Sequence, residues 1–222
     1  AFFLNILTAN TMTLANSIAR KLLQINAIKL NPQKPFTWAS GMKSPIYCDN
    51  RTVLSYPAIR REVIDGFVSR SEAFRPFDLV AGVATAGIAH GVLLAERLDL
   101  PFVYVRSKAK AHGRQNQIEG FLRSGERALV IEDLISTGGS SLKAVEALRE
   151  AGCPVAGVLA IFSYGFPEAD AAFLAADCPF DTLSNYDALL QEAIDGNYIE
   201  QSDRQLLHEW RRAPGAWSEA GP

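Results

Sequence analysis

Short apolar runs alternate with amphipathic stretches along most of the chain. Four runs have the length and composition of buried strands: 78–83, 101–105, 128–132 and 155–162. Apolar residues at helical spacing predict helices over 13–26, across 59–67 after Pro57, over 86–98 and over about 140–151. Farther on, TLSNYDALLQEAI and SDRQLLHEWRR predict a short strand and two helices. This alternation is typical of an α/β protein whose central, mostly parallel sheet is flanked by helices.

The same pattern indicates one domain over 12–212, with a small N-terminal appendage over about 13–55. Residues 1–11 lack the basic start and cleavage site of a signal peptide. We therefore expect Met12 to be the native start and 1–11 to be a non-native or disordered extension. Residues 213–222 are expected to form a frayed tail.

Composition narrows the class of protein. The chain has 222 residues, of which 48% are hydrophobic and 21% charged, and its formal net charge is -2. This charge gives no reason to expect a nucleic-acid partner, and no apolar stretch approaches the ~20 residues of a membrane span. The three cysteines are far apart and show no metal-ligand spacing. We expect a cytoplasmic protein with reduced thiols.

The most informative stretch is ALVIEDLISTGGSSLKAVEALREAG, residues 128–152. Glu132 and Asp133 follow an apolar strand and precede a loop of glycines and hydroxyl side chains. Amides and hydroxyls at the start of a helix can bind a phosphate, whereas carboxylates suit the vicinal hydroxyls of a sugar. A sugar phosphate fits both halves. The alternative is an ordinary strand-to-helix turn with Ser140 or Ser141 as the N-cap, which the adjacent acids disfavour.

A second stretch is basic. Arg106, Lys108, Lys110, His112 and Arg114 alternate with small or polar residues, so an extended chain would turn them to one side. Such a row of cations would stabilise a departing diphosphate, and His112 could donate a proton to the leaving oxygen. The alternative is a solvated basic hairpin.

These motifs together resemble a known family. ALVIEDLISTGGS is similar to the phosphoribosyl-diphosphate (PRPP) motif of type I phosphoribosyltransferases. Three further stretches resemble orotate phosphoribosyltransferases within that family: FTWASGMKSPIYCDNR (36–51), LVAGVATAGIAHG (79–91) and VRSKAKAHG (105–113). The resemblance covers residues 12 to about 210. It implies the type I phosphoribosyltransferase fold, with the appendage forming a hood subdomain.

The resemblance also implies an activity. A glycosyltransferase of this family transfers the 5-phosphoribosyl group of PRPP to orotate, giving orotidine 5′-phosphate and pyrophosphate in pyrimidine biosynthesis. It implies Mg²⁺ as the cofactor, held mainly through substrate and water rather than by a protein metal site. It further implies a homodimer in which the loop 106–114 reaches the partner's active site.

Site residues carry over by position in the motifs. Those implied to bind PRPP are Arg106, Lys108, Lys110, His112, Glu132, Asp133, Leu134, Ile135, Ser136, Thr137, Gly138, Gly139 and Ser140. Lys108 is the weaker match, because some relatives place this lysine where Ser107 stands here. Lys110, His112 and Asp133 are expected to be catalytic. The two acids are expected to hold the ribose hydroxyls.

The base pocket departs from the pattern. Some relatives have a lysine at the position of Ala39 and an arginine near that of Tyr164. We therefore expect orotate to contact Ser136, Lys43, and the Tyr47 and Cys48 backbone. Trp38, His90 and His208 are interpreted as a packing residue, a structural residue, and a surface or interface residue.

Two other functions stay open at this point. One is a phosphoribosyltransferase for a purine or another pyrimidine, against which the SGMKSPIY and KAKAHG segments argue. The other is a PRPP-sensing regulator, which would show salt-dependent DNA binding.

Overall fold

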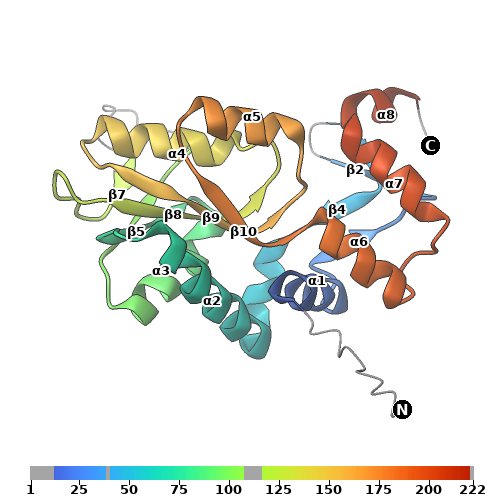
Figure 1. Cartoon of the computed structure of the whole chain (residues 1–222), viewed down its shortest axis with the longest axis horizontal. Helices are drawn as coiled ribbons and strands as arrows, with labels where there is room; N and C mark the ends of the chain where they lie inside the picture. The colour runs from blue at the N-terminus through green and yellow to red at the C-terminus, as the bar shows by residue number, and fades with distance from the viewer. Residues whose placement is uncertain (1–12, 39–40, 108–116, 221–222) are drawn as a thin grey trace, which may run out of the picture.

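The computed structural model describes residues 13–38, 41–107 and 117–220, with a six-stranded sheet at the centre (Figure 1). The strands, in spatial order, are β10 (Phe180–Asn185), β9 (Val155–Ser163), β8 (Ala128–Ile135), β5 (Leu79–Val83), β6 (Phe102–Val105) and β7 (Ile118–Glu119). β7 pairs antiparallel with β6, and the other neighbours are parallel. This confirms the predicted α/β class.

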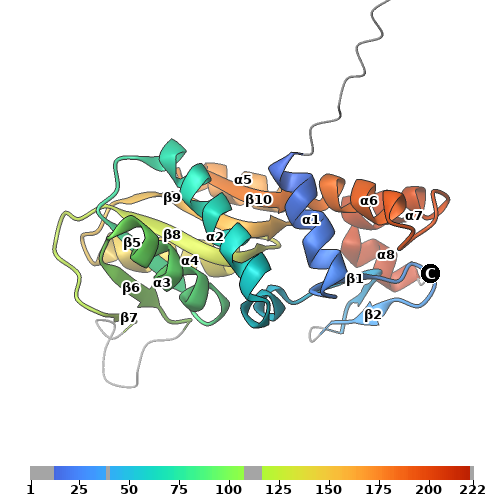
Figure 2. The ribbon, with the colours of Figure 1, turned by 90° about the horizontal axis from the view of Figure 1, so that it is seen from below.

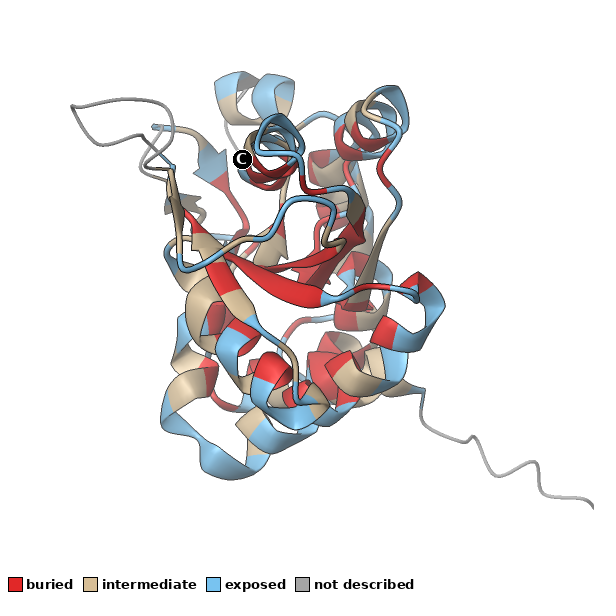
Figure 3. Ribbon diagram, turned by 90° about the vertical axis from the view of Figure 1, so that its left-hand side faces the viewer, coloured by how far each residue is buried: buried red, intermediate tan, exposed pale blue. Residues whose placement is uncertain are grey.

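Helices cover both faces of the sheet. α2 (Pro57–Ser71) and α3 (Ala86–Leu98) lie on one face, and α4 (Gly139–Glu150) and α5 (Pro167–Ala175) lie on the other (Figures 1 and 2). Successive side chains of β8 alternate between two cores: Leu129 and Ile131 join the first, Ala128 and Val130 the second. The sheet is accordingly buried between layers whose outer surfaces are exposed (Figure 3).

The N-terminal appendage forms the expected hood at one end of the sheet. It comprises α1 (Leu14–Gln24), β1 (Ile28–Leu30), β2 (Phe36–Thr37), β3 (Lys43–Ser44), β4 (Ile46–Cys48) and the 3₁₀ helix η1 (Asn50–Ser55). β1 pairs antiparallel with β4, and β2 with β3. The C-terminal helices α6 (Tyr186–Asp195), α7 (Asp203–Arg212) and α8 (Pro214–Ala220) lie beside it (Figure 1).

The structure departs from the sequence prediction at the C-terminus. Residues 214–220, predicted to be a frayed tail, form α8. This helix contacts β3, where the main-chain N–H of Lys43 donates to Ser218 Oγ at 2.7 Å. A tertiary contact therefore orders a segment whose sequence alone indicates fraying.

A second departure concerns β8. The sequence predicts that this strand ends at Glu132, yet it runs on to Ile135. Pairing with β9 continues to the Ile135–Ser163 pair, which keeps both acids within the sheet. The helices and strands that the pattern did not predict are β1–β4, β7, α5, α8, η1 and η2 (Glu72–Phe74).

Within the described parts of the chain, no helix has both the length and the apolar character needed to cross a membrane.

Candidate active site

Three parallel strands bring the predicted site segments to one edge of the sheet. Gly82 of β5 pairs with Tyr104 of β6 on one side and with Ile131 of β8 on the other. The residues that follow these strands therefore emerge at the same level, where ligands of open α/β sheets bind. Arg106 and Asp133 are two strands apart, which corresponds to roughly 10 Å between their backbones.

Glu132 faces α4 and is almost fully buried, with 4% of its surface exposed. Its carboxylate accepts the Asp133 N–H at 3.0 Å and the Ser140 hydroxyl at 3.1 Å. Burial, and then repulsion from Asp133, raise the pKa of Glu132 to about 8. Burial also raises the pKa of Asp133, but a hydrogen bond with Glu132 and the charge of Arg51 oppose this rise. Of the two carboxyl groups, Glu132 therefore holds a proton more readily than Asp133 does.

The start of α4 leaves donors without protein partners. Gly138 is the N-cap, with φ of +83°, and no side chain caps the helix. A Cβ at Gly138 would lie 2.7 Å from the Phe173 ring, so this turn requires glycine. The Ser141 hydroxyl is buried and has no hydrogen-bond partner in the described structure. The ordinary capped turn, with Ser140 or Ser141 as N-cap, is not what forms here.

The loop between β5 and α3 lies against the acidic strand. A Cβ at Gly87 would lie 2.3 Å from the Ile131 carbonyl oxygen and 3.3 Å from the Glu132 Cα. Only glycine allows so close an approach. The peptide bond between Ala84 and Thr85, at the start of this loop, is cis.

The hood contacts the acidic strand through the residues after β4. The Asn50 side chain is fully buried, and its Nδ2 donates to the Asp133 main-chain oxygen at 2.7 Å. Burial, followed by the charges of Asp133 and Asp49, raises the pKa of the Cys48 thiol well above its ordinary value. Cys48, one of the predicted base contacts, therefore lies near enough to Asp133 for the carboxylate charge to act on its thiol.

Two other predicted base contacts are placed differently. Lys43 is exposed on β3, and Ser136 is half-buried directly after β8. Trp38 packs as predicted, with its ring 5.7 Å from that of Tyr164 and its indole N–H donating to the Ile46 oxygen at 3.1 Å. The Tyr164 ring therefore packs against Trp38 of the hood.

β6 and β7 precede and follow the basic stretch along the chain. The Arg106 N–H donates to the Gln117 oxygen at 2.9 Å, and the Arg106 guanidinium lies 3.5 Å from Glu119. Lys108, Lys110 and His112 lie outside the described residues, as does Ala39.

Several predicted PRPP contacts lie in or next to α4 and β8. Thr137 and Gly139 are exposed, whereas the Ile135 side chain is in the core and Leu134 packs against it. Any contact of Ile135 with a ligand would therefore use its backbone.

The two histidines interpreted as non-catalytic lie on helices α3 and α7. His90 is buried on α3 with neither ring nitrogen hydrogen-bonded in the described structure. His208 is half-exposed on α7, in an open cleft of 530 Å³ with Arg211 and Arg212.

Two residues of this site were not predicted. Asn50 and Arg51 lie in the SPIYCDNR stretch, but no role followed from the pattern. The available signal was the polar run Asp49-Asn50-Arg51 directly after a short apolar strand.

Residues 50–179 match the family model described as "Phosphoribosyl transferase domain". The orotate phosphoribosyltransferase of Phocaeicola vulgatus is 56% identical over 211 residues, which cover 94% of this chain and 99% of that protein. The orotate phosphoribosyltransferase of Enterococcus faecalis is 51% identical, covering 92% and 98%. The crystal structure of orotate phosphoribosyltransferase from Aeropyrum pernix superposes with a TM-score of 0.71 and 28% identity, covering 79% and 97%.

Proposed function

The chain belongs to the orotate phosphoribosyltransferase family, and we propose that it uses the edge formed by β5, β6 and β8 to make orotidine 5′-phosphate. In this pentosyl transfer, the bond between ribose C1′ and the diphosphate oxygen breaks, and a bond from orotate N1 to C1′ forms. Pyrophosphate leaves, and the N1 proton is lost to solvent or to the leaving group.

The observation that carries the proposal is the division of the acidic pair. Glu132 turns toward the uncapped start of α4, and Asp133 is bonded through its main-chain oxygen to Asn50 of the hood. The amides at the start of α4 and the Ser141 hydroxyl supply donors for the 5-phosphate. The ribose then extends over the acids, and the base lies between Asp133 and the hood.

Each acid has its own role in the proposal. Asp133 carries the negative charge, so it accepts from a ribose hydroxyl and offsets the positive charge that develops on the ribose ring. Glu132 holds Ser140 and the turn before α4, and it accepts from the ribose after losing its proton. Ser136, Thr137 and Gly139 complete the phosphate loop.

The diphosphate lies toward the loop after β5 and the end of β6. Arg106 is fixed at this end by Gln117 and Glu119. Lys108, Lys110 and His112, which lie outside the described residues, stabilise the departing charge, and His112 donates to the leaving oxygen.

Mg²⁺ fits the donors at this edge. Across the described residues, no group of three or more His, Cys, Asp or Glu side chains is placed to hold a metal ion. Two adjacent carboxylates, together with substrate oxygens and water, suit its preference for oxygen ligands. When bound, Mg²⁺ would neutralise charge on the diphosphate, and Glu132 and Asp133 are the residues that would help to hold it.

The base contacts are proposed on the hood side of Asp133. Orotate would bind between Ser136 and the Tyr47–Cys48 backbone, with Lys43 as a further contact. The enzyme would act as a homodimer whose loop 106–114 completes the partner's site.

The proposed function is tested by pyrophosphate release. The protein is given PRPP and Mg²⁺ with orotate, uracil, hypoxanthine or adenine in separate reactions. Release is expected with orotate. Release with a purine only would replace the base assignment, and PRPP binding without release for any base would favour a regulator.

A further inference from the structure

The chemistry of orotate sets where its carboxylate must be bound. This carboxylate is on the ring carbon next to N1, the atom that bonds to ribose C1′. A residue that binds it must therefore lie at the border between the base contacts and the ribose contacts. This inference rests on the function proposed above.

A carboxylate brought to that border meets a negative charge. Asp133 lies there, fixed through its main-chain oxygen to Asn50. Two carboxylates at close range repel each other strongly when water is excluded, so a cation is required between them. An arginine is well suited, because its planar fork bonds a carboxylate through two parallel hydrogen bonds.

Arg51 is placed at this border by its neighbour. Asn50 is bonded to the Asp133 oxygen at 2.7 Å, so the Arg51 backbone begins one residue away from the acidic strand. The Arg51 charge acts on two groups, Asp133 of the ribose side and Tyr47 of the base side. The guanidinium is therefore near one group from each set of proposed contacts.

The Arg51 guanidinium is held in position but still accessible. Its Nε and Nη2 donate to the Asp49 carboxylate at 2.7 and 2.9 Å. Its Nη1 has no partner among the residues that the structure describes, and 62% of the side chain is exposed. One edge of the fork is fixed by Asp49, and the Nη1 edge can receive a second carboxylate.

Lys43 is the other described cation considered for this role. Its strand, β3, pairs with β2, and its main chain is bonded to Ser218 of α8. That contact ties Lys43 to the C-terminal helices, whereas Arg51 is tied to the acidic strand. We infer that Arg51 binds the orotate carboxylate and thereby selects orotate over bases that lack it.

The test compares two nucleotides that differ only in this carboxylate. Orotidine 5′-phosphate carries it and uridine 5′-monophosphate does not, so the ratio of their Kd values isolates its contribution. Phosphate and ribose contacts cancel in the ratio. Titration calorimetry on the full chain measures both constants without needing turnover.

In Arg51→Gln, preference for orotidine 5′-phosphate should fall by about 10- to 100-fold, the range expected for a charge-assisted hydrogen bond. The Kd of uridine 5′-monophosphate should stay within about 2-fold, since its contacts remain. Arg51→Lys should keep part of the preference, because it retains the charge and loses the fork. Asp49→Asn, which frees the guanidinium, should lower the preference by a smaller factor.

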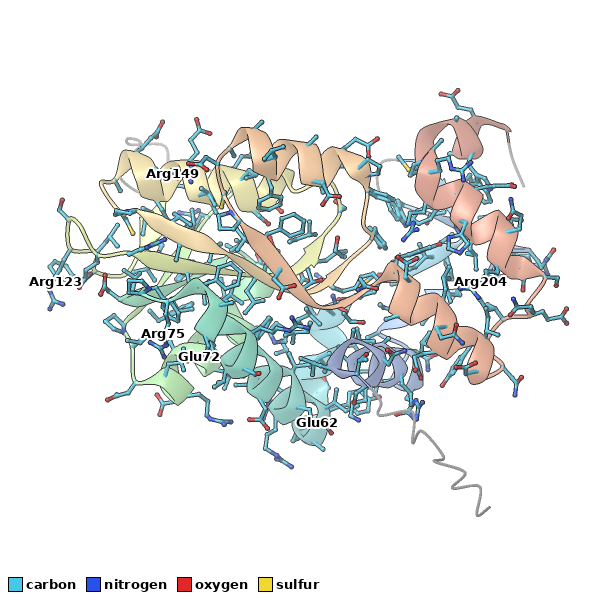
Figure 4. All side chains as sticks on the ribbon, viewed as in Figure 1. Glu62, Glu72, Arg75, Arg123, Arg149 and Arg204 are labelled. Atoms are coloured by element: carbon cyan, nitrogen blue, oxygen red, sulfur yellow. The ribbon has the colours of Figure 1, made fainter. Side chains whose placement is uncertain are left out.

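Arg75→Gln is the matched control. Arg75 is also an exposed arginine paired with an acid, Glu72, at 2.9 Å. Figure 4 shows this pair at the end of the molecule remote from α7, where Arg204 is labelled. The preference of Arg75→Gln for orotidine 5′-phosphate over uridine 5′-monophosphate should equal that of the wild type.

Three results would overturn the inference. The preference could stay unchanged in Arg51→Gln, both Kd values could rise together, or Lys43→Gln alone could abolish the preference. If Arg51→Gln does not fold, Arg51→Lys and Asp49→Asn decide by the same ratio. A wild-type protein that binds neither nucleotide would instead refute the proposed function, and the inference with it.

Discussion

The Asn50 amide donates to the main-chain oxygen of Asp133 at 2.7 Å, across 83 residues of sequence. This bond joins the first residue of η1, the last element of the hood, to the strand that carries both acids. The Asn50 Oδ1 has no partner in the described structure, so the Asn50 side chain is fixed through its Nδ2 donor alone. The hood and the acidic strand are therefore held together at the point where base and ribose would meet.

Asn50→Leu is expected to lower the free energy of unfolding and, separately, to raise the KM for orotate. Loss of this donor leaves the Asp133 oxygen unsatisfied, which costs about 1–3 kcal/mol of the free energy of unfolding. The KM for orotate should rise, since the hood strand is no longer fixed to Asp133. Denaturant unfolding and steady-state kinetics measure the two effects.

Asn185→Ala is the control for this variant. Asn185 caps α6 by accepting the Ala188 N–H at 3.0 Å, so its loss should cost about 1 kcal/mol. Its KM for orotate should equal that of the wild type. An equal change in both variants would show that Asn50 acts only through stability.

Gly87→Ala should be strongly destabilising. The new methyl group would lie 2.3 Å from the Ile131 oxygen, so α3 must move away from β8. We expect a loss of about 2–4 kcal/mol, at or above the usual cost of overpacking. Gly215→Ala, whose Cβ meets nothing within 4 Å, should leave unfolding almost unchanged. A melting temperature of Gly87→Ala equal to the wild type would contradict the close contact.

His90 should make stability fall in acid. Burial, and then repulsion from Arg60, lower the pKa of His90 from 6.5 to about 4. Between these values the unfolded chain binds a proton that the folded chain does not. Stability is therefore fully present above pH 6.5 and is lost as the pH falls to 4, by at most about 3 kcal/mol. His90→Leu should flatten this slope in urea titrations, and His208→Gln should retain it.

Glu132 should act in the opposite direction. Its pKa is raised from 4.5 to about 8, so the folded chain keeps a proton that the unfolded chain releases. This contribution is present below pH 4.5 and is lost as the pH rises through 8. Glu132→Gln should therefore lose less stability than the wild type between pH 6.5 and 9, where His90 no longer titrates. If the stability of both proteins declined equally over this pH range, the titrating proton would belong to a group other than Glu132.

Mixing two inactive variants tests the proposed dimer. Lys110→Ala and Asp133→Asn carry their defects in the loop and in the acidic strand. If the loop serves the partner's site, random exchange of subunits restores intact sites in mixed dimers, up to about a quarter of the total. Pyrophosphate release should rise on mixing. No gain after verified exchange would mean that each loop serves its own subunit, and a protein that stays monomeric would refute the dimer itself.

The sequence predicted β5, β6, β8 and β9 of the central sheet because these strands are long enough to show a pattern. β8 and α3 have apolar runs and helical spacing that few other structures would satisfy. The hood strands have only two or three residues each, too few to show any period. α5 was missed because its short, alanine-rich sequence, PEADAAFLA, does not separate apolar from polar residues at helical spacing.

The candidate site was predicted in part for the same reason. Glu132 and Asp133 are adjacent in a single motif, so local sequence identified them. Asn50 reaches Asp133 only through the packing of the hood, and α8 is ordered only by its contact with β3. Such long-range contacts leave no periodic signal in the chain.

The most direct test of the central claim compares the wild type with Asp133→Asn in forming orotidine 5′-phosphate from orotate and PRPP. PRPP binding is measured on both proteins. The wild type should release one pyrophosphate for each product, and Asp133→Asn should bind PRPP yet react at least about 100-fold more slowly, since it lacks the charge that stabilises the transition state. A wild type that binds PRPP and forms no product from orotate, or an Asp133→Asn variant with the wild-type rate, would contradict the account.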